Sequence, residues 1–291
     1  MTRRGWLLFC AMCLLWGMPY LLIKVAVEEL SPAVLVFART ALGAGILLPI
    51  AAARGELLPL LARWRPLVAF AILEMAIPWL LLADAERSLT SSLTGLLVAA
   101  VPMVAAVASR ALGEQDRLDR VRMLGLVVGI AGVATLLGLD LGGERRAAAE
   151  VGIVVLGYGI APLIVSRKLS DVPALGVIAS SLGLTALLYA PFAALTWPAR
   201  APSGKVVASV VVLALACTVA AFLVFFALIA EVGPNRALVI TFVNPAVAVL
   251  LGIALLDEHF TAGVAVGFPL VLLGCVLATR RSGSFPAIAE P

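Results

Sequence analysis

The sequence carries little charge for its length. Only 13% of its 291 residues are Asp, Glu, Lys or Arg, whereas 63% are hydrophobic and the mean hydropathy is +1.13. A soluble globular domain has about 25% charged and about 45–50% apolar residues, because polar groups must cover its surface. The composition therefore excludes disordered and collagen-like chains, nucleic-acid-binding domains and ordinary cytosolic enzymes. It is typical of a protein embedded in a lipid bilayer.

Residues and motifs used in metal, nucleotide and nucleophile chemistry are also scarce. The one histidine, His259, stands at a predicted helix end, so no histidine-based metal site is expected. The four cysteines lie inside apolar runs and are interpreted as small core side chains, not as a disulfide framework. The chain has no Gly-x-x-x-x-Gly-Lys-Ser/Thr loop and no nucleophile elbow. We expect no metal, no cofactor, no nucleic-acid partner and no enzymatic activity.

What the sequence does contain is a series of long apolar runs. A helix that spans a bilayer needs about 17–25 mostly apolar residues, and these runs lack the alternation typical of barrel strands. The sequence predicts an all-α membrane protein with ten transmembrane helices. The runs are 5–24, 32–53, 66–85, 90–109, 123–139, 151–167, 173–197, 206–229, 236–256 and 262–279. The first run is kept as a helix because no clear signal-peptide cleavage site interrupts it.

The basic residues indicate the orientation of these helices. If the N-terminus is cytoplasmic and ten helices alternate, 14 of the 21 lysines and arginines fall on the cytoplasmic side and 6 on the outer side. The remaining one, Arg39, lies inside the second helix. Because cytoplasmic loops are enriched in basic residues, we expect a multi-pass protein of the cell (inner) membrane. Both termini are then cytoplasmic, including a short tail at 282–291.

The two halves of the chain repeat a set of motifs in one order, at an offset of 141–144 residues. Because each unit holds five helices, an odd number, the second unit enters the membrane from the opposite side. The sequence thus predicts two inverted five-helix repeats, at 1–140 and 150–281, a construction that many secondary transporters use. The paired motifs are Trp16-Gly17 with Tyr158-Gly159, Pro32 with Pro173, Pro49 with Pro191, Val101-Pro102 with Asn244-Pro245, Leu112-Gly113-Glu114 with Leu256-Asp257-Glu258, and Gly125 and Gly132 with Gly267 and Gly274.

The same segments carry a resemblance to a known family. They are Leu15-Trp16-Gly17, Pro32 with Arg39, Ala85-Glu86-Arg87 through Pro102, Gly113-Glu114, the glycine-rich fifth helix, Asn244-Pro245 and Asp257-Glu258. Over about 5–281 the chain resembles the EamA-type transporters of the drug/metabolite transporter (DMT) superfamily. The resemblance implies a ten-helix inner-membrane carrier, often an exporter of amino acids, other metabolites or toxic compounds.

We therefore expect a secondary transporter that moves a small organic solute, such as an amino acid, a metabolite or a drug, by alternating access. Export is the expected direction, driven by the solute gradient or by protons. Two other classes stay open: a membrane-embedded enzyme acting on a lipid, and a non-transporting membrane receptor or assembly protein.

Placing an ionisable side chain in the interior of a membrane is energetically unfavourable, so each such residue is expected to have a function or a partner. Glu74, in the middle of the third run, is expected either to carry a proton or bind a solute amine, or to tie its helix to a neighbour. Arg39 is expected to pair with Glu74, to hold a solute carboxylate, or to reach the outer headgroups. The other candidates for solute binding are polar or aromatic: Trp16, Tyr20, Trp79, Tyr158 and Asn244.

Helix breakers inside the apolar runs mark candidate hinges and cavity walls, with plain helix curvature as the alternative. They are Gly17, Pro19, Pro78, Pro102, Gly159, Pro162 and Pro245. Lys24 is expected to anchor in headgroups. Asp84, Glu86 and Arg87 are expected to be solvated loop charges, with an outer gate as the alternative. The small residues of Gly125-x-x-x-Gly129 and Gly263-x-x-x-Gly267 predict close packing within each half rather than dimer faces.

Overall fold

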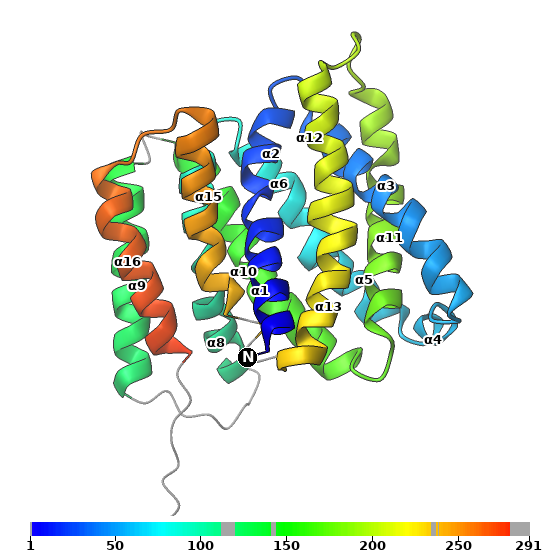
Figure 1. The fold of residues 1–291 in the computed structure, drawn as a ribbon, viewed down its shortest axis with the longest axis horizontal. Helices are drawn as coiled ribbons and strands as arrows, with labels where there is room; N and C mark the ends of the chain where they lie inside the picture. The colour runs from blue at the N-terminus through cyan, green and yellow to red at the C-terminus, as the bar shows by residue number, and fades with distance from the viewer. Residues whose placement is uncertain (1, 112–119, 141–143, 234–236, 238, 280–291) are drawn as a thin grey trace, which may run out of the picture.

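The architecture comes from a computed structural model of the chain. The structure describes residues 2–111, 120–140, 144–233, 237 and 239–279. Over these residues it is helical and contains no strand. Its helices run up and down in one layered bundle (Figure 1), with the N-terminus and the end of the last helix at the same end. We call this end the lower end and the opposite end the upper end. Glu114 and the predicted tail at 282–291 lie outside the described residues.

The elements are given in chain order. The first half contains α1 (Arg3–Gly17), α2 (Pro19–Ala26), α3 (Pro32–Ala53), α4 (Leu58–Leu61), α5 (Trp64–Ala71), the π-helix η1 (Ile72–Ala76), α6 (Ile77–Ala85), α7 (Ser91–Val98), α8 (Val101–Ala111) and α9 (Arg120–Asp140). The second half contains α10 (Arg145–Lys168), α11 (Ala174–Leu195), α12 (Gly204–Ala214), the π-helix η2 (Leu215–Ala220), α13 (Ala221–Val232), α15 (Ile240–Leu256) and α16 (Ala262–Ala278).

Within the described part of the chain, eight helical segments are long and apolar enough to cross a membrane. They are Arg3–Ala26, Pro32–Ala53, Trp64–Ala85, Ser91–Ala111, Arg120–Gly138, Arg145–Lys168, Ala174–Leu195 and Gly204–Val232. The helices α15 and α16 are apolar but shorter, with 17 residues each. The ten predicted runs fall on these eight segments and two shorter helices, so the prediction of an all-helical membrane protein is confirmed.

Hydroxyl side chains set the start of several helices. Ser31, Thr90, Ser203 and Thr261 each accept a hydrogen bond from the backbone N–H three residues further on. Such a cap satisfies one of the four N–H groups that a helix start leaves unpaired. At the other end of α15, Asp257 takes a left-handed conformation with φ of 53° and ends the helix. These short-range signals fix where the spans begin and end.

Helix contacts group the core of the molecule into two bundles, which meet where α7 packs against α15 and α2. The helix α10 packs against α5, η1, α6, α7 and α8, whereas α1 and α2 pack against α12, α13 and α15. We call the set α1, α2, α12, η2, α13 and α15 bundle A, and the set α5, η1, α6, α7, α8 and α10 bundle B. The pairs α3 with α11 and α9 with α16 flank them at the two sides (Figure 1). Each bundle therefore combines helices from both halves of the chain.

Glycines bring α9 and α16 into close contact. A Cβ atom on Gly132 would lie 2.6 Å from the backbone nitrogen of Val271, and one on Gly274 would lie 2.8 Å from the carbonyl oxygen of Gly125. Real Cβ atoms essentially never come so close, so only glycine permits this approach. The prediction that Gly125-x-x-x-Gly129 and Gly263-x-x-x-Gly267 pack within each half is wrong for Gly125 and Gly267. A Cβ atom on Gly125 would meet Ala278 of α16, and one on Gly267 would meet Leu136 of α9. These contacts join the last helix of the first half to the last helix of the second.

Candidate functional site

A cavity of about 1420 Å³ lies between the two bundles. Its lining begins at Ile23 of α2 and Leu82 of α6 and reaches Arg110, Ser166 and Thr279, which lie near the helix ends of the lower end. Pockets for drug-sized molecules occupy about 300–1,000 Å³. The cavity is therefore large enough for a small organic molecule together with water, and it extends from the centre of the protein toward the lower end.

All seven side chains that the sequence analysis selected for solute or proton binding line this cavity. They are Trp16, Tyr20, Arg39, Glu74, Trp79, Tyr158 and Asn244. They come from seven different elements, namely α1, α2, α3, η1, α6, α10 and α15. The structure thus brings them together in one place, while their roles in binding stay predictions.

Glu74 lies in the π-helix η1, halfway along the third span. Its Oε2 atom is buried and makes no hydrogen bond. Pro78 lacks the N–H that would bond to the Glu74 carbonyl four residues earlier, which accounts for the break in the α-helical pattern beside it. A carboxylate without partners in an apolar wall is unfavourable. It can be stabilised there by a proton or by a cationic group of a bound molecule.

Arg39 is buried in α3, with 8% of its surface exposed. Its Nε donates to Oγ1 of Thr218 at 2.8 Å, and its guanidinium carbon lies 3.7 Å from the ring centroid of Trp79. This stacking is a cation–π contact. No ion pair joins Arg39 to Glu74, and burial excludes the expected reach to the headgroups. The two terminal nitrogens of Arg39 make no hydrogen bond to any described residue, so they are available to bind a carboxylate. That role stays a prediction.

One wall of the cavity is aromatic. The rings of Phe222 and Phe225 lie with their centroids 5.9 and 4.8 Å from that of Trp16, and Phe226 continues the wall. Sequence reasoning missed these three phenylalanines and Thr218. Their signal was present, because positions 222, 225 and 226 are spaced by three and four residues and so share one face of α13.

The predicted hinge prolines fall into two groups. The α-helical path is interrupted beside Pro19, Pro78 and Pro102, which stand in the first turns of α2, α6 and α8. Pro162 and Pro245 lie inside the continuous helices α10 and α15. All except Pro78 line the cavity. Their function as hinges stays a prediction.

The two predicted hinge glycines make close helix contacts. A Cβ atom on Gly17 would lie 2.5 Å from the Cβ of Val247 in α15, and one on Gly159 would lie 2.6 Å from Cγ1 of Val104 in α8. These glycines therefore let α1 approach α15 and let α10 approach α8. Close packing accounts for glycine at both positions, and Gly17 also stands at the break between α1 and α2. Their function as hinges stays a prediction.

Lys24 closes part of the upper end. Its Nζ donates to the carbonyl oxygens of Glu86 at 2.6 Å and Leu89 at 2.7 Å, which follow α6. Lys24 is therefore not the headgroup anchor that the sequence predicted. The side chain of Glu86 is fully buried, so the prediction of a solvated loop charge is wrong for this residue. The contact links bundle A to bundle B.

Glu258 makes the second link between the bundles at the upper end. Its carboxylate follows α15 and accepts hydrogen bonds from the backbone N–H groups of Ser91 at 2.7 Å and Ser92 at 3.0 Å, and a short one from the Ser92 hydroxyl. These N–H groups begin α7, where the helix dipole favours a negative charge. A residue of bundle A thus caps a helix of bundle B.

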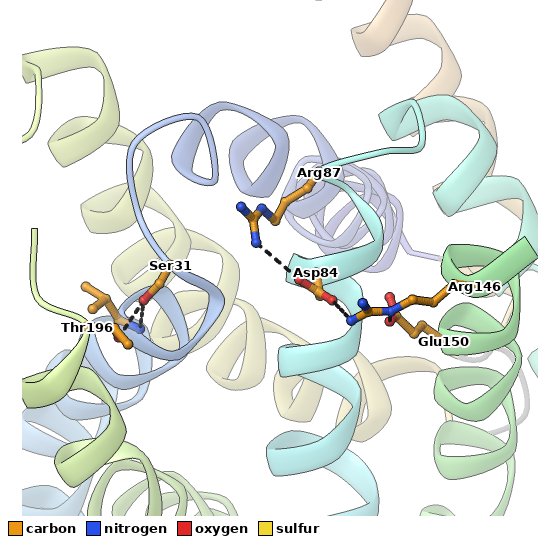
Figure 2. A network of polar contacts seen from close by, with 7 residues as sticks. Ser31, Asp84, Arg87, Arg146, Glu150 and Thr196 are labelled. Carbon is orange, nitrogen blue, oxygen red and sulfur yellow. Dashed lines mark hydrogen bonds and ion pairs between the residues drawn. The ribbon is translucent and has the colours of Figure 1, made fainter. Parts of the chain in front are cut away.

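A more exposed network lies nearby at the same end (Figure 2). Arg146 of α10 binds Asp84 of α6 and Glu150, each at 2.7 Å, and Arg87 lies 3.5 Å from Asp84. Solvent screening makes such pairs worth little. Their exposure agrees with the expectation of solvated charges for Asp84 and Arg87. Because α6 and α10 both belong to bundle B, this network does not link the two bundles.

At the lower end, Arg63 before α5 forms an ion pair with Asp171 after α10, with 2.6 Å between nitrogen and oxygen. Both residues adjoin helices of bundle B. The hydrogen bond from Arg63 holds the pKa of the Asp171 carboxyl below its usual value. In bundle A, the Thr2 hydroxyl donates to Glu231 at 2.5 Å. Each of these two polar contacts lies within one bundle, so neither of them joins bundle A to bundle B.

A bundle of apolar spans around a central, partly charged cavity defines a polytopic α-helical membrane protein. The EamA-like transporter family matches residues 3–138 and again residues 151–280. The chain belongs to this family of membrane transporters. The expected resemblance to EamA-type transporters of the DMT superfamily is thereby confirmed, and the family indicates a transporter in a lipid bilayer with a small-molecule substrate rather than an enzyme.

Curated relatives of nearly full length bear similar names. The chain is 28% identical over 290 residues to the uncharacterized inner membrane transporter YedA of Escherichia coli K12, covering 95% of this chain and 91% of that protein. It is 24% identical over 296 residues to the uncharacterized transporter YvbV of Bacillus subtilis, covering 97% and 94%. A crystal structure with 21% identity superposes with a TM-score of 0.67, covering 96% of this chain and 98% of that one, and so shares the fold.

Proposed function

We propose that this protein exports a small organic solute by alternating access, with bundles A and B as the two moving parts. The observation that carries the proposal is the cavity, which reaches one end of the protein and is bounded by polar inter-bundle contacts at the other. A carrier must bind its solute from one side and release it to the other, so it needs such a site in the middle of the membrane.

The proposed architecture is ten membrane-spanning helices in two inverted repeats, 1–140 and 150–281. Three observations support it. The family matches each half separately. A π-helix interrupts the third span of each half, as η1 and η2. The contacts of the two halves also correspond. The first span of the second half, α10, packs against α5–α8 of the first half, and the first span of the first half, α1 and α2, packs against α12–α15 of the second half. At 17 residues, α15 and α16 reach the lower limit for a span.

The proposed orientation places the lower end in the cytoplasm. Basic side chains cluster there, at Arg54, Arg63, Arg110, Arg167 and Lys168. Cytoplasmic loops are enriched in such residues. With this orientation both termini are cytoplasmic and the structure is an inward-facing state, into which a solute for export enters directly from the cell.

The cavity indicates the kind of solute. The terminal nitrogens of Arg39 suit a carboxylate, because a guanidinium offers paired donors to two oxygens. Glu74 suits an amine or a proton. The wall formed by Trp16, Phe222 and Phe225 suits an apolar or aromatic body. We therefore assign an amphipathic solute such as an amino acid, a metabolite or a drug with similar groups.

Arg39 also suggests how binding is coupled to movement. It contacts Thr218 of η2 in bundle A and Trp79 of α6 in bundle B. A carboxylate that draws the guanidinium toward the cavity weakens one or both contacts. Solute binding then changes the balance between the two arrangements of the bundles, as any ligand with differential affinity for two states must.

The test is solute flux in proteoliposomes, measured for wild type and Glu74→Gln over a range of pH. We expect Glu74→Gln to reduce transport about 10–100-fold, because a hydrogen bond to a charged group contributes about 1.5–3 kcal/mol. Glu28→Gln, which alters an exposed carboxylate paired with Lys205, is the matched control and should transport normally. Unaltered transport with unaltered pH dependence in Glu74→Gln would remove Glu74 from the mechanism.

The solute itself is found by comparing metabolites released from cells with and without the protein. We expect a compound with a carboxylate and an apolar body to accumulate outside the cells that carry it. Release of no compound at all, with flux absent from proteoliposomes loaded with the same compounds, contradicts the assignment as an exporter.

A further inference from the structure

Glu86 is an acidic side chain that the proposed transport cycle leaves unexplained. It follows α6 directly, its exposed fraction is 0%, and neither of its carboxyl oxygens makes a hydrogen bond. Lys24 is near, but its Nζ bonds to the carbonyl oxygens of Glu86 and Leu89 and not to the carboxyl group. A buried carboxylate with no hydrogen bond is strongly disfavoured relative to its protonated form.

Three ionisable groups face Glu86 from the elements around it. Lys24 and Tyr20 come from α2, and Glu258 comes from the loop after α15. Burial raises the pKa of the Glu86 carboxyl well above its usual range, the positive charge of Lys24 opposes this, and the negative charge of Glu258 adds to it. The geometry and the charges both favour a bound proton in this state.

The groups around Glu86 are the ones that join the bundles at the upper end. Lys24 of bundle A holds the loop that follows α6, and Glu258 caps α7 of bundle B. Gly252 leaves room for this cap, because a Cβ atom there would lie 2.5 Å from the Ser92 hydroxyl. Opening the upper end must break these contacts and admit water to Glu86.

We propose that Glu86 is a proton-binding site in an outer gate formed by Lys24, Glu86 and Glu258, and that the gate is closed while Glu86 holds its proton. On opening, the O–H bond of the carboxyl group breaks and the proton passes to water on the outer side. Lys24, released from its two carbonyl acceptors, then neutralises the new carboxylate. This inference rests on the proposed function for the orientation of the gate and for the existence of an open state.

The sign of the pH dependence follows from proton linkage. The closed gate binds the proton more tightly than an open gate, in which water surrounds Glu86. Below the ordinary pKa of a glutamic acid, about 4.3, both states are protonated and pH has no effect. Above it the ratio of open to closed gates rises by up to about tenfold per pH unit. The rise ends where the closed state also loses its proton.

The experiment uses electron–electron double resonance to measure the distance between two spin labels placed on either side of the gate. Ser88→Cys and His259→Cys place them on exposed loops at the upper end, one after α6 and one after α15. The four native cysteines are replaced, and the protein is held in nanodiscs without added solute. In otherwise wild-type protein we expect a longer distance to gain population from pH 5 to pH 9. Glu86→Gln, which cannot ionise, should keep the short distance throughout.

Two further variants define the controls. Asp84→Asn changes a neighbouring carboxylate that pairs with Arg146 inside bundle B, so its pH response should equal that of wild type. Glu258→Gln weakens the cap on α7 and should increase the population of the longer distance at every pH. A wild-type pH response in Glu86→Gln, or no response in wild type, overturns the proposal.

Infrared absorption provides a measurement that does not depend on the folding of Glu86→Gln. In the Glu74→Gln protein at pH 6, we expect the band of a protonated carboxyl group, and we expect it to vanish over the pH range in which the labels separate. Absence of this band at pH 6 overturns the proposal. Neither measurement needs a solute, so a pH-dependent gate without flux contradicts only the transport function, and flux through a pH-independent gate contradicts only this inference.

Discussion

At the scale of single residues, polar side chains hold each π-helix from the opposite half of the chain. Arg39 in the first half donates to Thr218 in η2, whose hydroxyl in turn donates to the carbonyl of Leu213. Tyr189 in the second half donates from its hydroxyl to the carbonyl of Ala76 in η1, at 3.0 Å. A π-helix disturbs the regular ladder of backbone bonds, so side-chain donors satisfy acceptors that would otherwise be left in an apolar interior.

Tyr189→Phe should therefore lower the stability of the protein. We expect the free energy of unfolding to fall by about 1–2 kcal/mol, because the hydrogen bond is lost and a buried carbonyl is left with one partner fewer. The measurement is thermal or denaturant unfolding in detergent. Tyr20→Phe is the matched control, since the Tyr20 hydroxyl makes no hydrogen bond to a described residue and faces the cavity. Equal stability of Tyr189→Phe and wild type would contradict a structural role for this bond.

At the scale of the elements, the most constrained contact is the one between α9 and α16. Lipid is as apolar as a leucine side chain, so helices in a membrane associate through close packing rather than through the hydrophobic effect. Glycines on both helices supply that packing here, as the contact of Gly274 with Gly125 shows. The contact joins α9, the last helix of the first half, to α16, the last helix of the second half.

Gly274→Ala should weaken this contact. The added methyl group would meet the backbone of α9, which cannot move aside as a flexible side chain can. We expect a loss of about 1–3 kcal/mol in the free energy of unfolding, the usual cost of overpacking. Gly45→Ala in the exposed face of α3, where a Cβ meets nothing within 4 Å, should be neutral or slightly stabilising. Equal effects of the two substitutions would show that the contact is loosely packed.

At the scale of the whole molecule, the two bundles meet closely at the upper end and enclose a cavity toward the lower end. The links at the upper end run through Lys24 and Glu258, and each crosses from bundle A to bundle B. The proposed inverted repeats account for two such bundles in one chain. In each bundle, the first span of one half packs against the third and fourth spans of the other half.

Thiol labelling of intact cells tests the proposed orientation. Single cysteines replace Ser88 between α6 and α7 and Ser170 after α10, in a chain without native cysteines. A reagent that cannot cross the membrane should label Ser88→Cys and leave Ser170→Cys unlabelled, whereas a permeant reagent should label both. The reverse pattern would place the cavity toward the outside. Labelling of both by the impermeant reagent would contradict the alternating course of the helices.

The sequence predicted much of the candidate site and few of its contacts. It selected Glu74 and Arg39 because ionisable groups inside apolar runs are costly, a property that each residue carries without reference to the fold. It did not anticipate that Arg39 meets Thr218 or that Glu86 is buried. The Arg39–Thr218 contact and the burial of Glu86 both depend on segments far apart in the chain. Neither Thr218 nor Glu86 is conspicuous within its own segment.

The sequence alone determined where the apolar segments lie, that they are helices, and that the chain is a membrane protein of a recognisable family. These properties follow from about twenty neighbouring residues at a time, because a bilayer selects helices by length and apolarity. Only the tertiary structure decided which helices form each bundle, where the cavity opens, and which polar groups meet at its closed end. Those outcomes depend on the packing of whole helices, where one glycine or one buried carboxyl group sets how closely two distant segments can approach.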